Sequence, residues 1–240
     1  ISAPILVVTL PAENMTGTHQ MRNRQRDLIE RNTTGENWDI SEYELKGEWY
    51  PVNCREETLK IKGESPHIEK VMETCHGPII NNALLSKIST ELPPYAMRWT
   101  VFSANSFLAV FLKINRARNC SEFRNALREW KAVNQNVVFA DAHDIGYVQV
   151  GEIPIRAKGD GSVPMPGWTG DHEWISQIPF EGLPQLENPA RGYIVTANNR
   201  VSGPDFPYYL GRDYIYRDRA QRITEMIEER SAMDISAIQK

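Results

Sequence analysis

Two adjacent asparagines, Asn198 and Asn199, close an apolar run that reads GYIVTANNRV over residues 192–201. One interpretation is a turn, because asparagine tolerates left-handed backbone and its side chain hydrogen-bonds to nearby backbone groups. The other interpretation is chemical. A side-chain amide donates hydrogen bonds without changing charge, so it is ready to stabilise negative charge that develops on a reacting oxygen.

Arg222 is the second residue whose position suggests chemistry. It lies at the shoulder of an apolar stripe, which includes Met226, on a helix predicted over residues 218–230. We therefore expect its guanidinium to be part-buried and to need a partner. Asp218, one turn earlier, is the local candidate, and a polar active site is the alternative.

Other familiar catalytic motifs are missing from the sequence. It has no GxSxG elbow, HExxH zinc motif, P-loop or dinucleotide glycine fingerprint, and its 5 histidines are scattered, which favours structural roles for them. The three cysteines form no CxxC pair, which argues against zinc and against a redox motif. They fit one disulfide with a spare thiol, or three free thiols.

The bulk composition excludes two classes of partner. With 240 residues, 41% hydrophobic and 24% charged residues and a net charge of −4, the chain is typical of a globular protein of one or two domains without a nucleic-acid surface. No run approaches the roughly 20 apolar residues that span a membrane, so we expect no membrane anchor. The first residue is Ile1 rather than Met, which leads us to expect a processed chain or a fragment.

Several elements that must position these residues follow from local patterns. Residues 57–62 and 67–75 predict a hairpin whose register, if centred between Glu64 and Ser65, places Cys54 opposite Cys75. Residues 103–116 are apolar on most sides, which predicts a helix covered by other layers.

In the centre of the chain, a helix is predicted around residues 123–130, with Asn119 and Glu122 as a capping pair. The apolar runs 136–141 and 144–151 predict two strands in a tight hairpin. A long Gly/Pro-rich connector with aromatic residues follows over 157–191 and predicts an ordered loop. A strand at 192–197 then leads to the asparagine pair.

Read in order, several stretches from about residue 26 to 230 resemble successive blocks of the penicillin acylase family of amidohydrolases. The blocks are GEWYPVNCREETLKIKG, ETCHGPII, MRW, QNVVFADAHDIGYVQVGEIPIR, VPMPG, PFEGLP, NPARGYIVTANNRV and RAQRITEMI. The resemblance implies an α+β fold, part of the αββα four-layer sandwich of N-terminal-nucleophile hydrolases. It also implies a divergent segment at residues 1–25 followed by a partial acylase-like domain at 26–240.

The chemistry that the resemblance implies is acyl transfer to the hydroxyl of an N-terminal serine, with the serine's own α-amino group as base. In the family, an amide at the end of an NN strand stabilises the oxyanion, and the matching residue is Asn198; for Asn199 the turn interpretation is favoured. The family's arginine near the serine matches Arg222, whose charge would orient Asn198 and favour the neutral amine.

The same resemblance implies three further features. Trp99, in MRW, matches a position near the acyl pocket, with core packing as the alternative. Asp27, in RDLIER, matches a calcium ligand, although MRNRQR stands where further acidic residues are expected. The implied substrates are N-acyl amides such as penicillins or acyl-homoserine lactones. The penicillins link the resemblance to antibiotic biosynthesis. The implied location is periplasmic or extracellular.

The catalytic serine itself is not found where the family places it. Ser2 would become N-terminal after trimming of Ile1, but its spacing to Asp27 is too short for the family. We therefore expect a missing N-terminal segment or a companion chain to carry the serine, and this chain alone to be inactive. The alternative is a non-catalytic remnant or binding module that retains the acyl pocket.

Overall fold

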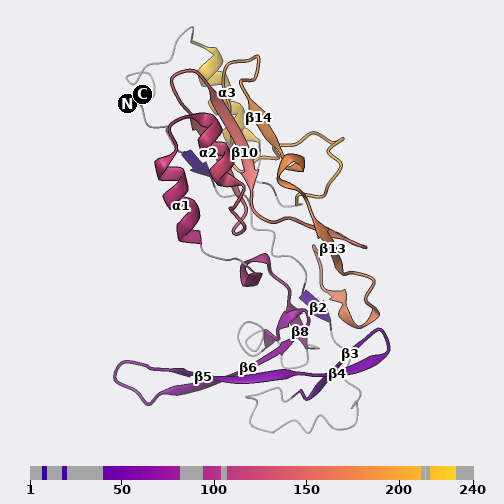
Figure 1. Ribbon diagram of the computed structural model, residues 1–240. Coiled ribbons are helices and arrows are strands. Elements are labelled where there is room, and N and C mark those ends of the chain that lie inside the picture. The colour runs from indigo at the N-terminus through magenta and orange to yellow at the C-terminus, as the bar shows by residue number, and fades with distance from the viewer. Residues whose placement is uncertain are drawn as a thin grey trace. The chain divides into compact units, whose positions relative to one another are not determined.

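The computed structural model describes residues 7–9, 18–20, 40–81, 94–103, 107–211, 214 and 217–230. The chain divides into two compact units, which are considered separately (Figure 1). The first unit contains residues 1–14, 103–155 and 177–240, and the second contains residues 15–102 and 156–176. Within the described ranges, no helix is long and apolar enough to cross a membrane.

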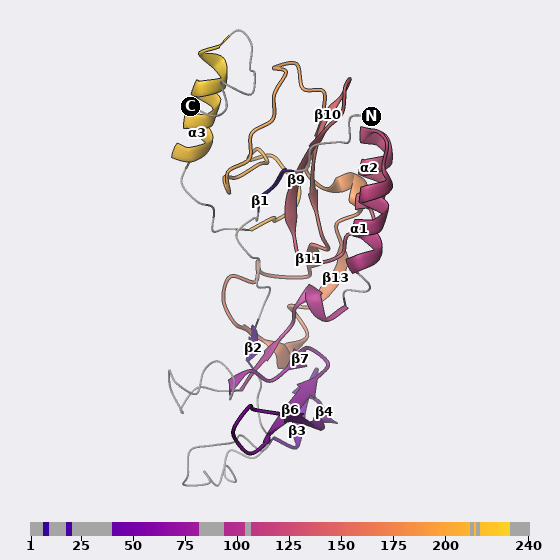
Figure 2. The same cartoon turned by 90° about the vertical axis from the view of Figure 1, so that its left-hand side faces the viewer.

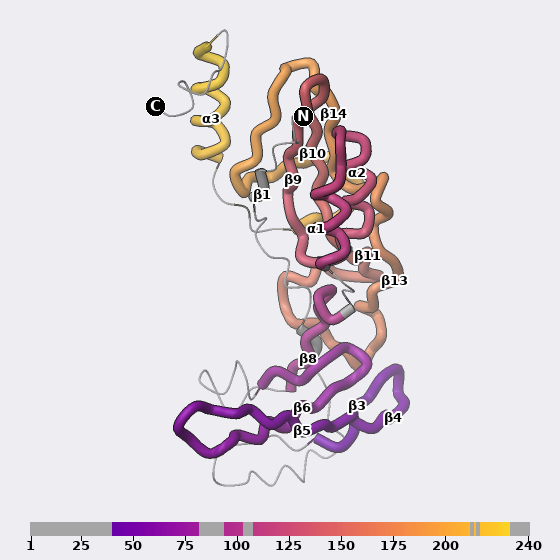
Figure 3. Tube along the Cα trace, turned by 60° about the vertical axis from the view of Figure 1, so that its left-hand side comes forward, coloured from indigo at the N-terminus to yellow at the C-terminus, as the bar shows by residue number. Residues whose placement is uncertain are grey.

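The first unit is built on an antiparallel four-stranded sheet in the order β1-β9-β10-β14. Its strands and helices are β1 (Val7–Thr9), α1 (Phe107–Arg116), α2 (Cys120–Leu127), β9 (Gln135–Ala140), β10 (Ile145–Val150), the 3-10 helix η4 (Phe180–Gly182), β14 (Gln185–Glu187) and α3 (Asp218–Glu228). Helices α1 and α2 lie on one side of this sheet and α3 lies on the other (Figures 2 and 3). Among the described residues, the chain passes between the units within η2 (Thr100–Ser103), β11 (Pro154–Arg156) and β13 (Trp174–Gln177).

The main core lies between the α1–α2 pair and the sheet. Val137, Phe139, Val148 and Val150 of β9 and β10 are buried there with residues of α1 and α2. The strand period of two turns Tyr147 to the opposite face, towards α3. Gly146 pairs with Phe139 across the strands, and a Cβ at Gly146 would lie 2.3 Å from the Phe139 ring, so the packing requires glycine.

Helix α2 confirms the capping prediction. Its N-cap is Asn119, whose Oδ1 accepts a hydrogen bond from the Glu122 amide at 2.8 Å. The expectation of a fully covered helix at 103–116 is wrong. Val110 and Ile114 are buried, but Leu108 is 70% exposed, because in the described structure only one side of α1 meets the core.

The predicted hairpin of β9 and β10 is also confirmed, and its turn is held by one carboxylate. Oδ1 of Asp141 accepts hydrogen bonds from the amides of His143 at 2.8 Å and Asp144 at 2.9 Å. Oδ2 of Asp141 accepts from the amide of Cys120, the first residue of α2, at 2.8 Å. These contacts lower the pKa of Asp141 and tie the hairpin turn to the start of α2.

The segment before the asparagine pair differs from its prediction. Residues 193–196 are not part of a sheet, although they were expected to form a strand. Apolar side chains do not make a strand without a neighbour whose backbone completes the ladder, and the described residues supply none here. The connector at 157–191 is ordered as predicted, with short strands and 3-10 turns along it.

The second unit contains three small sheets, in the orders β12-β2-β8, β3-β4 and β5-β6-β7. Its elements are β2 (Thr18–Gln20), β3 (Glu42–Leu45), β4 (Glu48–Pro51), β5 (Asn53–Leu59), β6 (His67–Thr74), β7 (Gly77–Pro78), β8 (Tyr95–Met97), β12 (Met165–Pro166) and the 3-10 helix η3 (Gly167–Thr169). A small core contains Tyr43 of β3 and Ala96 of β8.

The predicted hairpin is present as β5 and β6, but its register is not the one that pairs two cysteines. Cys54 lies opposite Met72, and all three cysteines, including Cys75, are free. The turn includes Gly63, whose φ of 86° is left-handed, rather than being centred between Glu64 and Ser65. This earlier turn shifts the pairing and excludes the Cys54–Cys75 alignment.

Candidate active site

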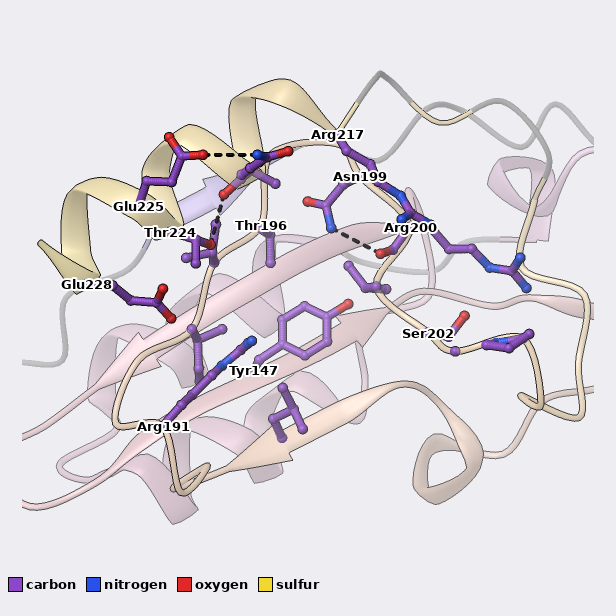
Figure 4. Close-up of a pocket in the computed structure, with 18 residues that line it drawn as sticks. Tyr147, Arg191, Thr196, Asn199, Arg200, Ser202, Arg217, Thr224, Glu225 and Glu228 are labelled. Carbon is purple, nitrogen blue, oxygen red and sulfur yellow. Dashed lines mark hydrogen bonds between the residues drawn. The ribbon is translucent and has the colours of Figure 1, made fainter.

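A pocket of about 750 Å³ lies in the first unit, between α3 and the segment that carries the asparagine pair (Figure 4). Tyr147 of β10 and Leu186 of β14 contribute from the sheet. The remaining lining residues are Arg191, Ile194, Val195, Thr196, Asn199, Arg200, Val201, Ser202, Gly203, Pro204, Arg217, Ala220, Gln221, Thr224, Glu225 and Glu228. The pocket therefore combines an apolar wall with a rim of amide and charged groups.

The polar side chains at the pocket are held by internal hydrogen bonds. The Tyr147 hydroxyl donates to Oδ1 of Asn136 at 2.7 Å, and burial raises the pKa of this phenol, so it stays protonated at neutral pH. Thr224 Oγ1 donates to the Ala220 carbonyl at 2.9 Å. Gln221 Nε2 donates to Oε1 of Glu225 at 3.0 Å.

The lining hydroxyls have no described histidine or lysine beside them, and the two lining carboxylates, Glu225 and Glu228, accept hydrogen bonds from Gln221 and Tyr193. Among the described residues that line the pocket, hydroxyls belong to Tyr147, Thr196, Ser202 and Thr224, and none of these lining residues is His, Lys or Cys. A serine or threonine hydroxyl is a weak nucleophile without an adjacent base. The described lining thus offers a ligand apolar contacts together with hydroxyl, amide and charged groups.

The two asparagines have different roles in the structure. Asn199 is used in its own turn: Oδ1 accepts from the Ala197 amide at 2.9 Å and Nδ2 donates to the Arg200 carbonyl at 3.0 Å, as the turn interpretation predicted. Asn198 has a left-handed φ of 59°, and its Oδ1 accepts a hydrogen bond from Nη1 of Arg219 at 3.1 Å. Its amide is therefore oriented by a cation of α3.

The expectation that Arg222 is part-buried is wrong. Its side chain is 59% exposed, and Nη1 is paired with Glu225 at 3.2 Å and Glu229 at 3.4 Å, not with Asp218. The hydrogen bond to Glu225, followed by the charge of Glu229, raises the pKa of the guanidinium. The physical reason is that this side of α3 faces solvent. Ile223 is also exposed there, so the apolar residues of the helix do not bury the neighbouring Arg222 side chain.

Arg219, which sequence analysis did not single out, is the arginine that contacts Asn198. The signal that could have found it is the spacing of arginines in RDRAQR, which places Arg217 at the pocket and Arg219 beside the asparagine pair.

Two other predicted site residues, Trp99 and Asp27, are not among the residues that line this pocket. Trp99 belongs to the second unit, where it packs edge-to-face on Phe102 with ring centroids 5.6 Å apart. Asp27 lies outside the described residues. The described part of the chain contains no group of three or more His, Cys, Asp or Glu side chains arranged to hold a metal ion, so the calcium expectation at Asp27 stays a prediction.

Comparisons with known proteins give a consistent result. Residues 17–240 match the family described as penicillin amidase. An acyl-homoserine lactone acylase QuiP of Pseudomonas fluorescens is 35% identical over 181 residues, which cover 75% of this chain and 22% of the relative. Penicillin G acylase of Escherichia coli is 30% identical over 194 residues, which cover 78% of this chain and 22% of the relative. The chain thus spans about a fifth of the length of these relatives.

A solved structure gives the fold. The thermostable penicillin G acylase from Alcaligenes faecalis superimposes with a TM-score of 0.75 at 23% identity, over 98% of this chain and 40% of that one. This match confirms the expected fold class, α+β and part of the sandwich of N-terminal-nucleophile hydrolases.

Proposed function

Because this chain belongs to the penicillin amidase family, we propose that it supplies the acyl-binding and oxyanion-stabilising part of an enzyme that hydrolyses N-acyl amides. The observation that carries this proposal is the hydrogen bond from Arg219 to Asn198, two residues that do not line the pocket themselves but whose chain neighbours Ala220 and Asn199 do. The names of the curated relatives, which are acylases, support the same reaction class.

In the proposed reaction, a serine hydroxyl attacks the acyl carbonyl and passes its proton to the serine's own α-amine, which titrates near neutrality with a pKa of about 8. The negative charge then lies on the former carbonyl oxygen. Asn198 donates to that oxygen through Nδ2, because Arg219 fixes Oδ1 on the opposite side of the carboxamide. The amine leaves with the proton, and water cleaves the acyl-serine ester.

We place the nucleophilic serine outside the described residues, on a further segment or a companion chain. The lining of the pocket supports this placement, because its described residues include no histidine or lysine and its carboxylates, Glu225 and Glu228, accept hydrogen bonds from Gln221, Arg222 and Tyr193. The length of the relatives supports it as well, since this chain spans about a fifth of them. The apolar wall, with Leu186, Ile194 and Val195, would receive the acyl chain.

Two arginines of α3 are proposed to act on Asn198. Arg222 matches the family's arginine in the block RAQRITEMI, whereas Arg219 is the residue whose side chain contacts Asn198 in the structure. For Arg222 to reach the site, its guanidinium would have to leave Glu225 and Glu229. We therefore assign the orientation of Asn198 to Arg219 and a longer-range electrostatic role to Arg222.

The experiment measures hydrolysis of a chromogenic N-acyl amide by this chain alone and by the chain expressed with the polypeptide encoded directly upstream. We expect no turnover by the chain alone and turnover with the upstream segment, lost when its serine is changed to alanine. Turnover by the chain alone that disappears in Ser2→Ala would contradict the external nucleophile. Acyl-ligand binding without turnover in both preparations would favour the non-catalytic binding module.

A further inference from the structure

The second unit contains a cluster of nucleophilic and titratable side chains that the proposed hydrolysis does not use. Cys75, in the turn between β6 and β7, is exposed, and its Sγ lies 3.5 Å from Nδ1 of His76. Nε2 of His76 lies 2.7 Å from Oε1 of Glu173, and the guanidinium of Arg98 donates to Oε2 of the same carboxylate. An exposed thiol, a histidine and a glutamate thus form a continuous chain of contacts.

The contacts determine which ring nitrogen faces the sulfur as an acceptor. The Glu173 carboxylate can only accept hydrogen bonds when ionised, so Nε2 of His76 carries a proton and donates to it. In the neutral imidazole, Nδ1 is then the unprotonated nitrogen and accepts the thiol proton of Cys75. His76 is held in this position because its side chain is only 2% exposed.

The contacts shift the pKa of the thiol down and the pKa of the imidazole up. Burial and the charge of Glu173 act to raise the pKa of Cys75, but the hydrogen bond and charge of His76 and the hydrogen bond of Tyr43 together outweigh them, so the pKa is lowered. Burial acts to lower the pKa of His76, but its contacts with Cys75 and Glu173 raise the pKa overall. Among the described residues, Glu173, Tyr43 and Tyr50 are the other titratable groups that interact with the thiol. The hydroxyl of Tyr43 accepts a hydrogen bond from the Cys75 amide at 3.2 Å.

Acyl transfer is not the reaction that this cluster fits. An acyl-enzyme intermediate needs amide donors for its oxyanion. The backbone amides of Cys75 and His76 already donate within the protein, that of Cys75 to Tyr43 and that of His76 to Oγ1 of Thr74, each at 3.2 Å. Thiol–disulfide exchange needs a thiolate and access but no oxyanion site.

We propose that Cys75 is a modification site that forms a mixed disulfide with low-molecular-weight disulfides, with His76 as its proton acceptor and Glu173 as the residue that positions the histidine. The Cys75 proton moves to Nδ1 of His76, and the thiolate attacks one sulfur of the incoming disulfide. A new S–S bond forms as the old one breaks, and the second half departs as a thiolate that takes a proton from His76 or water. Cys75 is oxidised and the departing thiol is the reduced product.

The chain provides its own controls. Cys54, in β5 opposite Met72, is another exposed thiol. Cys120 is buried, its Sγ donates to the Asp144 carbonyl at 3.4 Å, and burial with the neighbouring Asp141 raises its pKa to about 11. Exposure alone would make Cys54 and Cys75 similarly reactive, whereas the histidine contact distinguishes Cys75.

The test follows modification of the whole chain by the neutral disulfide dithiodipyridine, with each cysteine resolved by peptide mass spectrometry at several pH values. We expect Cys75 to react severalfold faster than Cys54 near pH 6, because the contact with His76 lowers the pKa of Cys75 and so raises its thiolate fraction. Cys120 should react most slowly. Equal rates for Cys54 and Cys75 across the acidic range would overturn the proposal.

A His76→Gln variant tests the role of the histidine directly, with circular dichroism as the check on folding. The Cys75 rate near pH 6 should fall to that of Cys54, while the Cys54 rate stays unchanged. An unchanged Cys75 rate in folded His76→Gln would show that the histidine does not activate the thiol. If the variant does not fold, the comparison of Cys75 with Cys54 in the unaltered chain still decides the proposal.

Discussion

Nη1 of Arg219 donates a hydrogen bond to Oδ1 of Asn198 at 3.1 Å, across 21 positions of the sequence. The contact joins α3 to the turn that ends the apolar segment at 193–197. It orients a carboxamide whose backbone is already in the left-handed region. The side chain of the neighbouring Asn199 forms hydrogen bonds within its own turn, to Ala197 and Arg200. The two adjacent side-chain amides therefore have different roles.

This contact predicts different effects for two arginines of α3. Arg219→Gln should lower kcat/KM for a chromogenic N-acyl amide about tenfold in the serine-bearing enzyme, because a hydrogen bond to a charged group contributes about 1.5 kcal/mol or more. Arg222→Gln removes the same charge from the same helix, but its contacts within the described structure are with Glu225 and Glu229, so a smaller loss is expected. A larger loss in Arg222→Gln would instead indicate that Arg222 acts on Asn198 in the complete enzyme.

Asp141 predicts a dependence of stability on pH. Its pKa is lowered in the folded chain by amide hydrogen bonds from His143, Cys120 and Asp144, whereas an unfolded aspartate titrates at about 3.9. A depressed folded pKa contributes stability that is present above about pH 4 and is lost as the pH falls further. Urea-unfolding midpoints of Asp141→Asn should therefore be lower at pH 7 and should change less between about pH 5 and pH 2.

The matched control for this prediction is Asp205→Asn, which makes the same change in net charge at an exposed position of the first unit. Its unfolding midpoints should follow those of the unaltered chain. Identical pH profiles for Asp141→Asn and Asp205→Asn would show that the hairpin turn does not depend on the carboxylate.

Gly146 predicts a packing defect. A methyl group there would lie 2.3 Å from Cε2 of Phe139, whose ring stacks on Phe123 at 5.0 Å, so the core must shift to admit it. Gly146→Ala should lower the free energy of unfolding by about 1–3 kcal/mol, the usual cost of overpacking. Gly203→Ala is the control, because nothing lies within 4 Å of its added Cβ. Equal stability of the two variants by denaturant unfolding would contradict the close approach.

Local sequence signals predicted the elements whose stabilising contacts lie nearby in the chain. The Asn119 cap of α2 and the hairpin of β9 and β10 depend on residues a few positions apart, so their patterns were sufficient. The α+β fold was predicted from the family resemblance, because local sequence patterns do not specify it.

The predictions that failed depend on contacts distant in sequence or on small geometric shifts. Residues 192–197 have strand-like side chains but no ladder partner among the described residues. The position of one glycine, Gly63, changes the register of β5 and β6 and separates Cys54 from Cys75. Helical periodicity placed Arg222 beside an apolar stripe but could not show that this side of α3 is exposed, nor that Arg219 reaches Asn198.

The most direct measurement is the turnover number of the serine-bearing enzyme with Asn198→Gly, in which glycine accepts the left-handed backbone and only the carboxamide is lost. Asn198→Asp is the companion variant, because it keeps the shape and the Arg219 contact but cannot donate to an oxyanion when ionised. We predict that kcat for the chromogenic amide falls by about 10²–10³ in both variants with little change in KM, as expected for a lost oxyanion donor. A kcat within about twofold of the unaltered enzyme in both variants would contradict the assignment of Asn198 to the oxyanion.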